Sequence, residues 1–160
     1  MKKITLLVIA CLILAGCSVP KSPSPASPIP AATETIPAQL VTYTLYLPNE
    51  NADGFQTEKI SIAEISPEII LTQLQENGVI PEDVIINTFE IKNTEIYMDF
   101  NQPLANAINS TGSSGELMIV GSIVNTYLSA YNAETLYFTI NGEILESGHV
   151  IYDFPISFTE

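Results

Sequence analysis

Few side chains in this 160-residue sequence could carry acid–base, nucleophilic or metal chemistry. It contains one His, two Cys and no Trp, whereas Asp and Glu together number 18. A metal site with several His or Cys ligands cannot be built from this set. His149, near an expected turn, has no second His with which to hold a metal ion. No Ser lies in a nucleophile elbow that His149 could activate. We therefore predict no catalytic residue, no cofactor and no metal site.

The segment from Asn49 to Gly54 is the one candidate for a calcium loop. It places Asn, Asn and Asp at positions one, three and five and Gly at position six. Ile60 stands where a bidentate acid is needed at position twelve, and the flanks indicate strands, not helices. A turn between two strands needs the same residue types. We favour the turn, and calcium binding stays the alternative.

Acids and tyrosines could also contribute to binding. With 18 acids, no single carboxylate pair points to a glycosidase. Asp99 or Asn101 is expected to cap the turn that leads to Pro103. Aromatic contact area could come from six tyrosines, about half of which we expect in the core: Tyr43, Tyr46, Tyr97, Tyr127, Tyr131 and Tyr137.

The segment Gly112 to Gly115 precedes the most helical part of the chain. Ser113 and Glu116 have the spacing of a capping box. An anion-binding helix start is the alternative interpretation. Glu116 in the first turn and the strong negative charge argue against phosphate, so we predict that these residues cap the helix.

The charge balance excludes nucleic-acid binding. Five Lys and no Arg stand against 18 acids, which gives a net charge of −13. A nucleic-acid partner requires cations that replace the phosphate counterions. Enzymes that handle phosphate likewise rely on Arg or a well-placed Lys. We predict that the partner is not a nucleic acid.

The N-terminus has the features of a bacterial lipoprotein signal. Met1-Lys2-Lys3 is followed by an apolar run from Ile4 to Leu14, which is too short to span a bilayer as a helix. Leu14-Ala15-Gly16-Cys17 resembles a lipobox, in which cleavage precedes a Cys that receives a diacylglyceryl group. We predict a signal peptide at 1–16 and lipid attachment at Cys17. Two acyl chains anchor a protein stably, whereas one does not.

The segment 17–40 is predicted to be a tether that carries the lipidated Cys. It is rich in Pro and Ser, and Pro prevents a helix or sheet from continuing through it. Cleavage would remove Cys11, Lys2 and Lys3, leaving three Lys against 18 acids, a charge of −15. Anionic lipid headgroups repel such a surface, so the acyl chains should make the membrane contact.

From residue 41 onward the patterns predict one domain, 41–160. Alternating apolar residues predict strands at 41–47, 59–62, 84–91, 95–100 and 136–140, with a last short strand near 150–152. Helices are predicted after Ser66-Pro67-Glu68 and over 114–131, and Asn141-Gly142 predicts a hairpin turn. This mixture predicts an α+β fold, with a mixed, largely antiparallel sheet and two helices packed on one face.

Five segments carry a family resemblance: Ile80-Pro81-Glu82-Asp83-Val84, Tyr97-Met98-Asp99-Phe100, Gly112-Ser113-Ser114-Gly115-Glu116, Ile123-Val124-Asn125-Thr126 and Leu136-Tyr137-Phe138-Thr139-Ile140-Asn141-Gly142. In this order they resemble the GerMN domain, a sporulation and spore-germination module of bacterial lipoproteins. Thr44 to Glu50 agrees more weakly, and a family Gly-Pro after the first helix is replaced by Gly78-Val79. The resemblance implies an extracytoplasmic binding or scaffolding module without catalytic residues.

We therefore expect an envelope protein of sporulation or spore germination, anchored through Cys17 on the extracytoplasmic face of the cell membrane. It is expected to bind another envelope protein, and a homo-oligomer is a further possibility. Exposed sheet edges or strand residues such as Thr42, Thr44 and Tyr46 are the expected contacts. One alternative is a wall-directed enzyme or a small-ligand receptor, which a deep pocket lined by carboxylates or by His149 would favour. Another is a vegetative envelope lipoprotein of the same fold.

Overall fold

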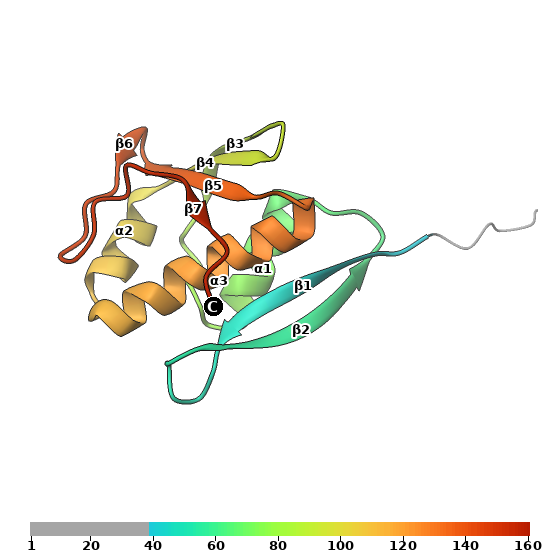
Figure 1. Ribbon diagram of the computed structural model, residues 1–160, viewed down its shortest axis with the longest axis horizontal. Helices are drawn as coiled ribbons and strands as arrows, with labels where there is room; N and C mark the ends of the chain where they lie inside the picture. The colour runs from blue at the N-terminus through green and yellow to red at the C-terminus, as the bar shows by residue number, and fades with distance from the viewer. Residues whose placement is uncertain (1–38) are drawn as a thin grey trace, which may run out of the picture. The chain divides into compact units, whose positions relative to one another are not determined.

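The computed structural model describes residues 39–160 (Figure 1). The interpretations of the signal peptide, of Cys17 and of almost all of the tether fall outside these residues. The elements in chain order are β1 (Val41–Pro48), β2 (Phe55–Ile62), α1 (Pro67–Glu76), β3 (Ile86–Lys92), β4 (Glu95–Phe100), α2 (Gln102–Asn109), α3 (Ser113–Tyr131), β5 (Thr135–Ile140), β6 (Glu143–Ile144) and β7 (Ile156–Ser157).

The strands of residues 39–160 form two sheets. β1 and β2 make an antiparallel hairpin in which Val41 pairs with Ile62 and Pro48 pairs with Phe55. The larger sheet has the order β3-β4-β5-β6, and β7 also pairs with β5. β4 and β5 are parallel, because α2 and α3 form the crossover between them, and the other pairs are antiparallel. The predicted α+β class with a mixed, largely antiparallel sheet is confirmed.

The arrangement of the helices differs from the expected pair on one face. Residues 39–160 form three helices, and the unexpected one is the short helix α2, which buries Leu104, Ala105 and Ile108 on one side. α3 lies between the larger sheet and the β1–β2 hairpin (Figure 1). Its residues from Met118 to Leu128 are all buried, as a helix covered on both sides requires.

α1 begins where the sequence predicts. The Ser66 Oγ accepts a hydrogen bond from the Ile69 N–H at 3.2 Å, and Pro67 is the first helical residue. Gly78 follows the C-cap with a φ of 70°, a left-handed conformation that favours glycine. Ile70, Leu71 and Leu74 form the apolar face of α1 and are buried in the core.

Polar side chains of α3 accept hydrogen bonds from the backbone N–H groups along the edge of β1 that does not pair with β2. The Ser129 Oγ accepts a hydrogen bond from the Thr44 N–H at 3.1 Å, and the Thr126 Oγ1 accepts one from the Tyr46 N–H at 3.0 Å. The backbone N–H groups of Thr44 and Tyr46 are therefore already bonded to α3 and are not open to pairing with another strand. Thr42 is exposed and bonds through its hydroxyl to Ser61 of β2 at 2.9 Å.

The C-terminal segment is held to α3 in a similar way. The Asn125 amide donates to the Thr159 carbonyl at 2.7 Å and its oxygen accepts from the Thr159 N–H at 2.8 Å. Ser122, Asn125, Thr126 and Ser129, which we call the polar stripe, thus lie at helical spacing along the middle of α3. Asn125, Thr126 and Ser129 of this stripe hydrogen-bond to the backbones of β1 and of the C-terminal segment. A neighbouring strand would otherwise supply these bonds.

Candidate protein-binding surface

The outer face of the larger sheet is the main candidate for a binding surface. Ile96, Met98 and Phe100 of β4 are buried, whereas the alternating residues of that strand point away from the core. β5 alternates in the same way, and the three helices lie on the other side of the sheet (Figure 1). The outer face therefore presents side chains from β3, β4 and β5 that no helix of residues 39–160 covers.

Two tyrosines form the centre of this face. Tyr97 of β4 pairs in register with Tyr137 of β5, and their rings stack with centroids 5.0 Å apart and planes 2° apart. The Tyr97 hydroxyl donates a 2.7 Å hydrogen bond to Glu95 Oε2. That bond, with smaller effects of burial and nearby negative charge, raises the pKa of Tyr97 to about 12. Tyr97 therefore stays protonated and keeps donating at physiological pH.

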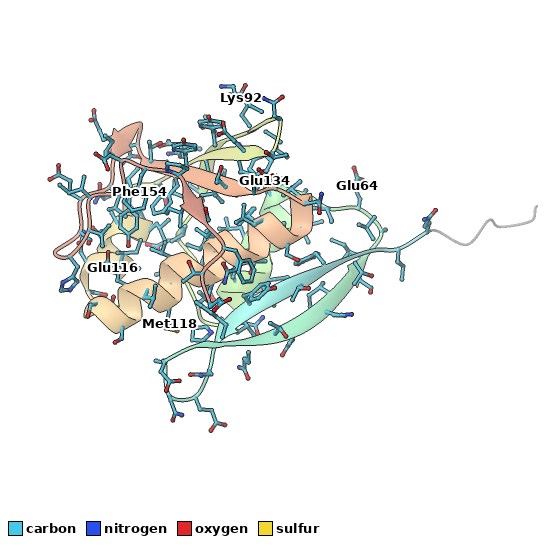
Figure 2. The ribbon with its side chains drawn as sticks, in the orientation of Figure 1. Glu64, Lys92, Glu116, Met118, Glu134 and Phe154 are labelled. Atoms are coloured by element: carbon cyan, nitrogen blue, oxygen red, sulfur yellow. The ribbon has the colours of Figure 1, made fainter. Side chains whose placement is uncertain are left out.

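A charged pair from β3 borders the tyrosines. Lys92 Nζ lies 4.8 Å from the centroid of the Tyr97 ring and 2.9 Å from Glu90 Oε2. The side chains of Lys92 and Glu90 are 54% and 60% exposed, and Figure 2 shows Lys92 at the outer margin of the sheet. An aromatic ring flanked by carboxylates attracts ammonium and guanidinium groups, so this part of the face is suited to a cation.

Asp99, on the same strand as Tyr97, does not cap a helix. Its carboxylate accepts hydrogen bonds from Thr139 Oγ1 at 2.6 Å, from the Gly142 N–H at 2.7 Å and from Asn87 Nδ2 at 2.8 Å. Burial raises the pKa of Asp99, but these three bonds together hold it below its ordinary value. Asp99 therefore joins β3, β4 and the turn after β5.

Asn101 also differs from its expected role. It occupies the N-cap position of α2, but its side chain makes no capping bond there. Its oxygen accepts from the Ile85 N–H at 3.0 Å, and its amide donates to the Asp83 carbonyl at 2.8 Å. The prediction that Asp99 or Asn101 caps this turn is thus wrong, because both side chains connect the turn to neighbouring segments.

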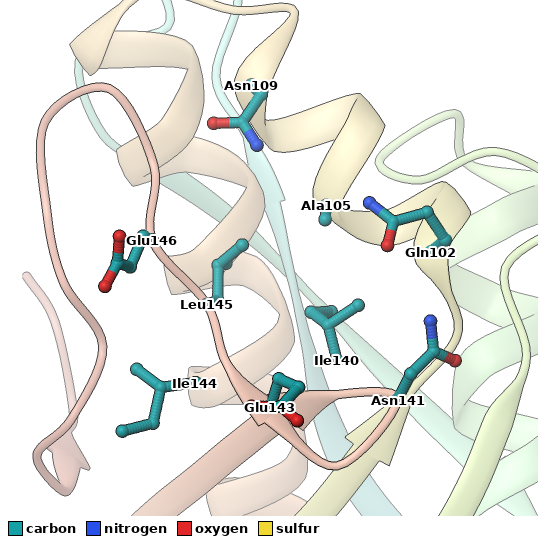
Figure 3. A pocket seen from close by; sticks show the side chains of 9 residues that line it. All are labelled: Gln102, Ala105, Asn109, Ile140, Asn141, Glu143, Ile144, Leu145 and Glu146. Carbon is teal, nitrogen blue, oxygen red and sulfur yellow. The ribbon is translucent and has the colours of Figure 1, made fainter.

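The Asn141-Gly142 turn is confirmed and borders an open pocket. Asn141 and Gly142 have φ angles of 52° and 81°, as a tight hairpin turn requires. The pocket has a volume of about 410 Å³ and lies between α2 and the chain around β6 (Figure 3). It is lined by Gln102, Ala105, Asn109, Ile140, Asn141, Glu143, Ile144, Leu145 and Glu146. Its apolar floor and polar walls could hold a small polar molecule or a side chain.

Glu116 is a buried acid and does not form the predicted capping box with Ser113. It is 3% exposed, and its Oε1 accepts hydrogen bonds from the hydroxyls of Ser147 and Tyr152, both at 2.6 Å. Within residues 39–160 its Oε2 has no hydrogen-bond partner. Gly112 is the N-cap of α3 and Ser113 makes no capping bond, so the predicted capping box is wrong. Glu116 instead fastens the segment between β6 and β7.

The other candidates take ordinary structural positions. His149 is exposed, and its backbone N–H donates to Ser147 Oγ at 3.0 Å. In the suggested calcium loop, Asn49 Nδ2 donates to Asp53 Oδ1 at 2.8 Å, and the Asp53 N–H donates back to Asn49 Oδ1 at 3.2 Å. These bonds close the turn between β1 and β2. The part of the chain described here contains no group of three His, Cys, Asp or Glu arranged to hold a metal ion.

The tyrosines divide between core and surface. Tyr43 and Tyr127 are buried, whereas Tyr46, Tyr97, Tyr131 and Tyr137 are half-buried. Sequence reasoning missed Glu90, Lys92 and Glu95 as neighbours of the tyrosine pair. The alternation on both sides of the Asn93 turn is the signal that could have found them, because it places Lys92 opposite Glu95 and Glu90 opposite Tyr97.

Residues 44–146 match the protein family described as Germane, sporulation and spore germination. The chain belongs to the Germane family. No curated protein matches it. None of the helices in residues 39–160 has the length and apolar character needed to cross a membrane.

Two solved structures share the fold of this Germane domain. The first GerMN domain of the sporulation protein GerM from Bacillus subtilis is 19% identical, with a TM-score of 0.55 over 73% of this chain and 97% of that one. The tandem GerMN domains of the same protein give 21% identity and a TM-score of 0.53, over 81% of this chain and 49% of that one. This chain therefore spans about half of the tandem structure. At these identities the likeness establishes the fold.

Proposed function

We propose that this Germane protein is a lipid-anchored, extracytoplasmic envelope protein that binds another envelope protein during sporulation or germination. The family supports the link to sporulation and germination. The observation that carries the binding role is the uncovered sheet face with its stacked tyrosines and its carboxylates. Tyrosine is enriched at protein interfaces because a rigid ring provides contact area at a small cost in conformational entropy.

The anchor follows from the first 40 residues of the sequence. The signal-like run and Leu14-Ala15-Gly16-Cys17 support cleavage before Cys17 and its diacylglyceryl modification. The Pro- and Ser-rich segment then gives the Germane domain a reach of up to about 3.1 Å per residue from the membrane. The domain would bind its partner at a distance from the lipid surface.

The anchor is tested by Cys17→Ala. We expect the variant to leave the membrane fraction and to lack the lipid, as shown by cell fractionation and mass spectrometry. Cys11→Ala is the matched control, because Cys11 lies in the apolar run and should be removed with it. Normal processing and membrane retention of the Cys17→Ala protein would contradict the proposal.

The binding role is tested by cross-linking and affinity capture from sporulating cells. We expect the full chain to recover an envelope protein and the double variant Tyr97→Ser/Tyr137→Ser to lose it. Phe158→Ser is the control, because this half-exposed ring packs against Tyr46 of β1 and lies away from the tyrosine pair. Circular dichroism confirms that each variant is folded. Equal capture by all three proteins, or hydrolysis of a wall fragment by the purified chain, would contradict the proposal.

The pocket beside β6 favours a second candidate, a small-ligand receptor. Two carboxylates, Glu143 and Glu146, and the amides of Gln102, Asn109 and Asn141 line it, and it contains no cationic side chain. Such a pocket would select a small amine. NMR titration of the full chain with simple amines tests this function, which requires saturable shifts at Ile140 and Leu145 that Glu143→Gln weakens.

Self-association would appear as a higher mass in light scattering.

A further inference from the structure

The chain supplies its own cation to the tyrosine and carboxylate site. Glu90, Tyr97 and Tyr137 pair in register across β3, β4 and β5 on the outer face of the sheet. Lys92, two residues after Glu90, reaches over the Tyr97 ring. Lys92 also contacts Glu90, whose side chain is 60% exposed. The ammonium group of Lys92 shows that a cation fits between an aromatic ring and a carboxylate at this position.

We propose that Glu90, Glu95, Tyr97 and Tyr137 form a recognition site for an arginine side chain of a protein partner, and that Lys92 occupies this site in the free protein. The inference rests on the proposed binding role and specifies the chemistry of the partner. On binding, the arginine displaces the Lys92 ammonium from the Tyr97 ring and from Glu90. Lys92 is thus an internal competitor.

Displacing Lys92 should be easy. Exposed ion pairs contribute little, because water and salt screen the charges and two long side chains must be held still. The Lys92–Glu90 pair belongs to this class, since both side chains are more than half exposed. The site can therefore exchange its cation without unfolding any part of the sheet.

Arginine suits the site better than a second lysine does. Its guanidinium is planar, stacks on an aromatic ring and can bind a carboxylate through two parallel hydrogen bonds, and it is less strongly hydrated than an ammonium. The Tyr97 ring provides the flat surface, and Glu90 and Glu95 flank it from β3 and from β4 itself. The stacked Tyr137 ring supports Tyr97 from β5.

The charge of the domain favours the same partner. Lys59 and Lys92 are the only Lys or Arg residues in residues 39–160, against 17 acids. A basic segment would be drawn towards this surface, and an acidic one repelled. Because Lys59 lies on β2, in the other sheet, it offers a control for charge alone.

The test compares Lys92→Met with Lys59→Met in the full chain. The probe is an acetylated Gly-Arg-Gly-Arg-Gly peptide, with the citrulline peptide as its uncharged counterpart. Both variants remove one positive charge, but only Lys92→Met vacates the site. We expect Lys92→Met to bind the arginine peptide about two- to fivefold more tightly than Lys59→Met does, and Tyr97→Leu to bind about fivefold more weakly than the unmodified chain.

Two NMR observations complete the test. Adding the arginine peptide should shift the ring signals of Tyr97 and Tyr137 and should remove the ring-current shift of the Lys92 side chain. The citrulline peptide should do neither. Equal affinities of the two Met variants, or an arginine-induced shift confined to other residues, would overturn the inference.

This outcome is separable from that of the proposed function. If an envelope protein is captured through Tyr97 and Tyr137 but the two Met variants bind the arginine peptide equally, the arginine site is wrong and the binding role stands. If the arginine peptide binds as expected but no envelope protein is captured, the recognition site stands and the proposed role fails.

Discussion

At the scale of single residues, Asp99 shows that a side chain's role depends on which strands lie beside it. Its position four residues before Pro103 suggests a cap, but the parallel pairing of β4 with β5 brings Thr139 next to it. Thr139 and Gly142, whose hydroxyl and N–H bond to Asp99, are 40 and 43 residues away from it in sequence. No local pattern contains this information.

We expect the stability contributed by Asp99 to depend on pH. Its folded-state pKa lies below the ordinary value of 3.8, so the contribution is complete above that value and is lost as pH falls through the lowered pKa. Asp99→Asn should reduce the free energy of unfolding by about 1–2 kcal/mol at neutral pH, and this difference should shrink below about pH 4. Urea unfolding at a series of pH values measures it. Glu58→Gln, on β2, is the control, and an Asp99→Asn effect that grows on acidification would contradict the expectation.

The hydroxyl of Tyr152 should stabilise the segment between β6 and β7. Burial, together with the hydrogen bond to Glu116, raises the pKa of Tyr152 well above its ordinary range, so this donor remains protonated. Tyr152→Phe should lower the free energy of unfolding by about 0.5–1.5 kcal/mol, the usual net contribution of an intramolecular hydrogen bond.

Tyr43→Phe is the matched control for this measurement. Within residues 39–160 the buried Tyr43 hydroxyl has no hydrogen-bond partner, so its removal should leave stability nearly unchanged or slightly raise it. Denaturant unfolding compares the two variants. Equal losses in both would mean that the Glu116 contact contributes nothing.

At the scale of elements, the sequence predicts best where one face of a strand is buried. Alternation correctly predicts β1, β4 and β5 because each buries every second residue. α2 was not predicted, because its eight residues include Pro103 and three amide side chains, which are typical of loops. Its apolar residues show helical spacing over only two turns.

Local sequence patterns also failed to predict which residues of α3 are buried. Leu117, an apolar residue of the first turns, is 47% exposed, whereas Glu116, Ser122, Asn125 and Thr126 are buried. A one-sided stripe is the expected pattern when one layer covers a helix. Here a second layer, β1 and β2, packs on the other side, and its backbone requires polar partners on the helix. The Tyr97–Tyr137 pair could not be predicted either, because it depends on the parallel pairing of β4 with β5.

The polar stripe of α3 gives a prediction at this scale. Thr126→Val keeps the shape of the side chain but leaves the Tyr46 N–H without its acceptor, so the free energy of unfolding should fall by about 1–3 kcal/mol. Ser122→Ala is the control, because the Ser122 hydroxyl is buried without a hydrogen-bond partner in residues 39–160. This change should be neutral or slightly stabilising.

Hydrogen exchange locates the effect of Thr126→Val. The amide of Tyr46 should exchange faster in this variant, while amides of β4 should keep their protection. Unchanged exchange at Tyr46, with unchanged urea unfolding, would mean that α3 does not hold the edge of β1.

At the scale of the whole molecule, negative charge dominates. The chain carries a net charge of −13, and its acids are spread over both sheets and the loops. Such a surface favours solubility and hastens the encounter with basic partners, but it adds little to specificity. Specificity must then come from local geometry such as the Tyr97–Tyr137 stack.

We expect binding of the arginine peptide to weaken as salt is added. The Debye length falls from about 30 Å at 0.01 M to about 8 Å at 0.15 M ionic strength, so distant acids stop contributing. Calorimetric titration of the full chain over this range should show the affinity falling several-fold, chiefly through a slower association rate in stopped-flow experiments. The citrulline peptide is the control. An affinity independent of salt would show that the overall charge takes no part.

The contact between β1 and α3 has a consequence for biosynthesis. Tyr46 and Thr126 are 80 residues apart, so the hairpin emerges from the ribosome well before the helix that covers it. At about 5–20 residues per second, the buried side of β1 waits several seconds for its partner. The domain can therefore finish folding only after α3 has been synthesised. Until then the uncovered hairpin is a suitable substrate for a holding chaperone.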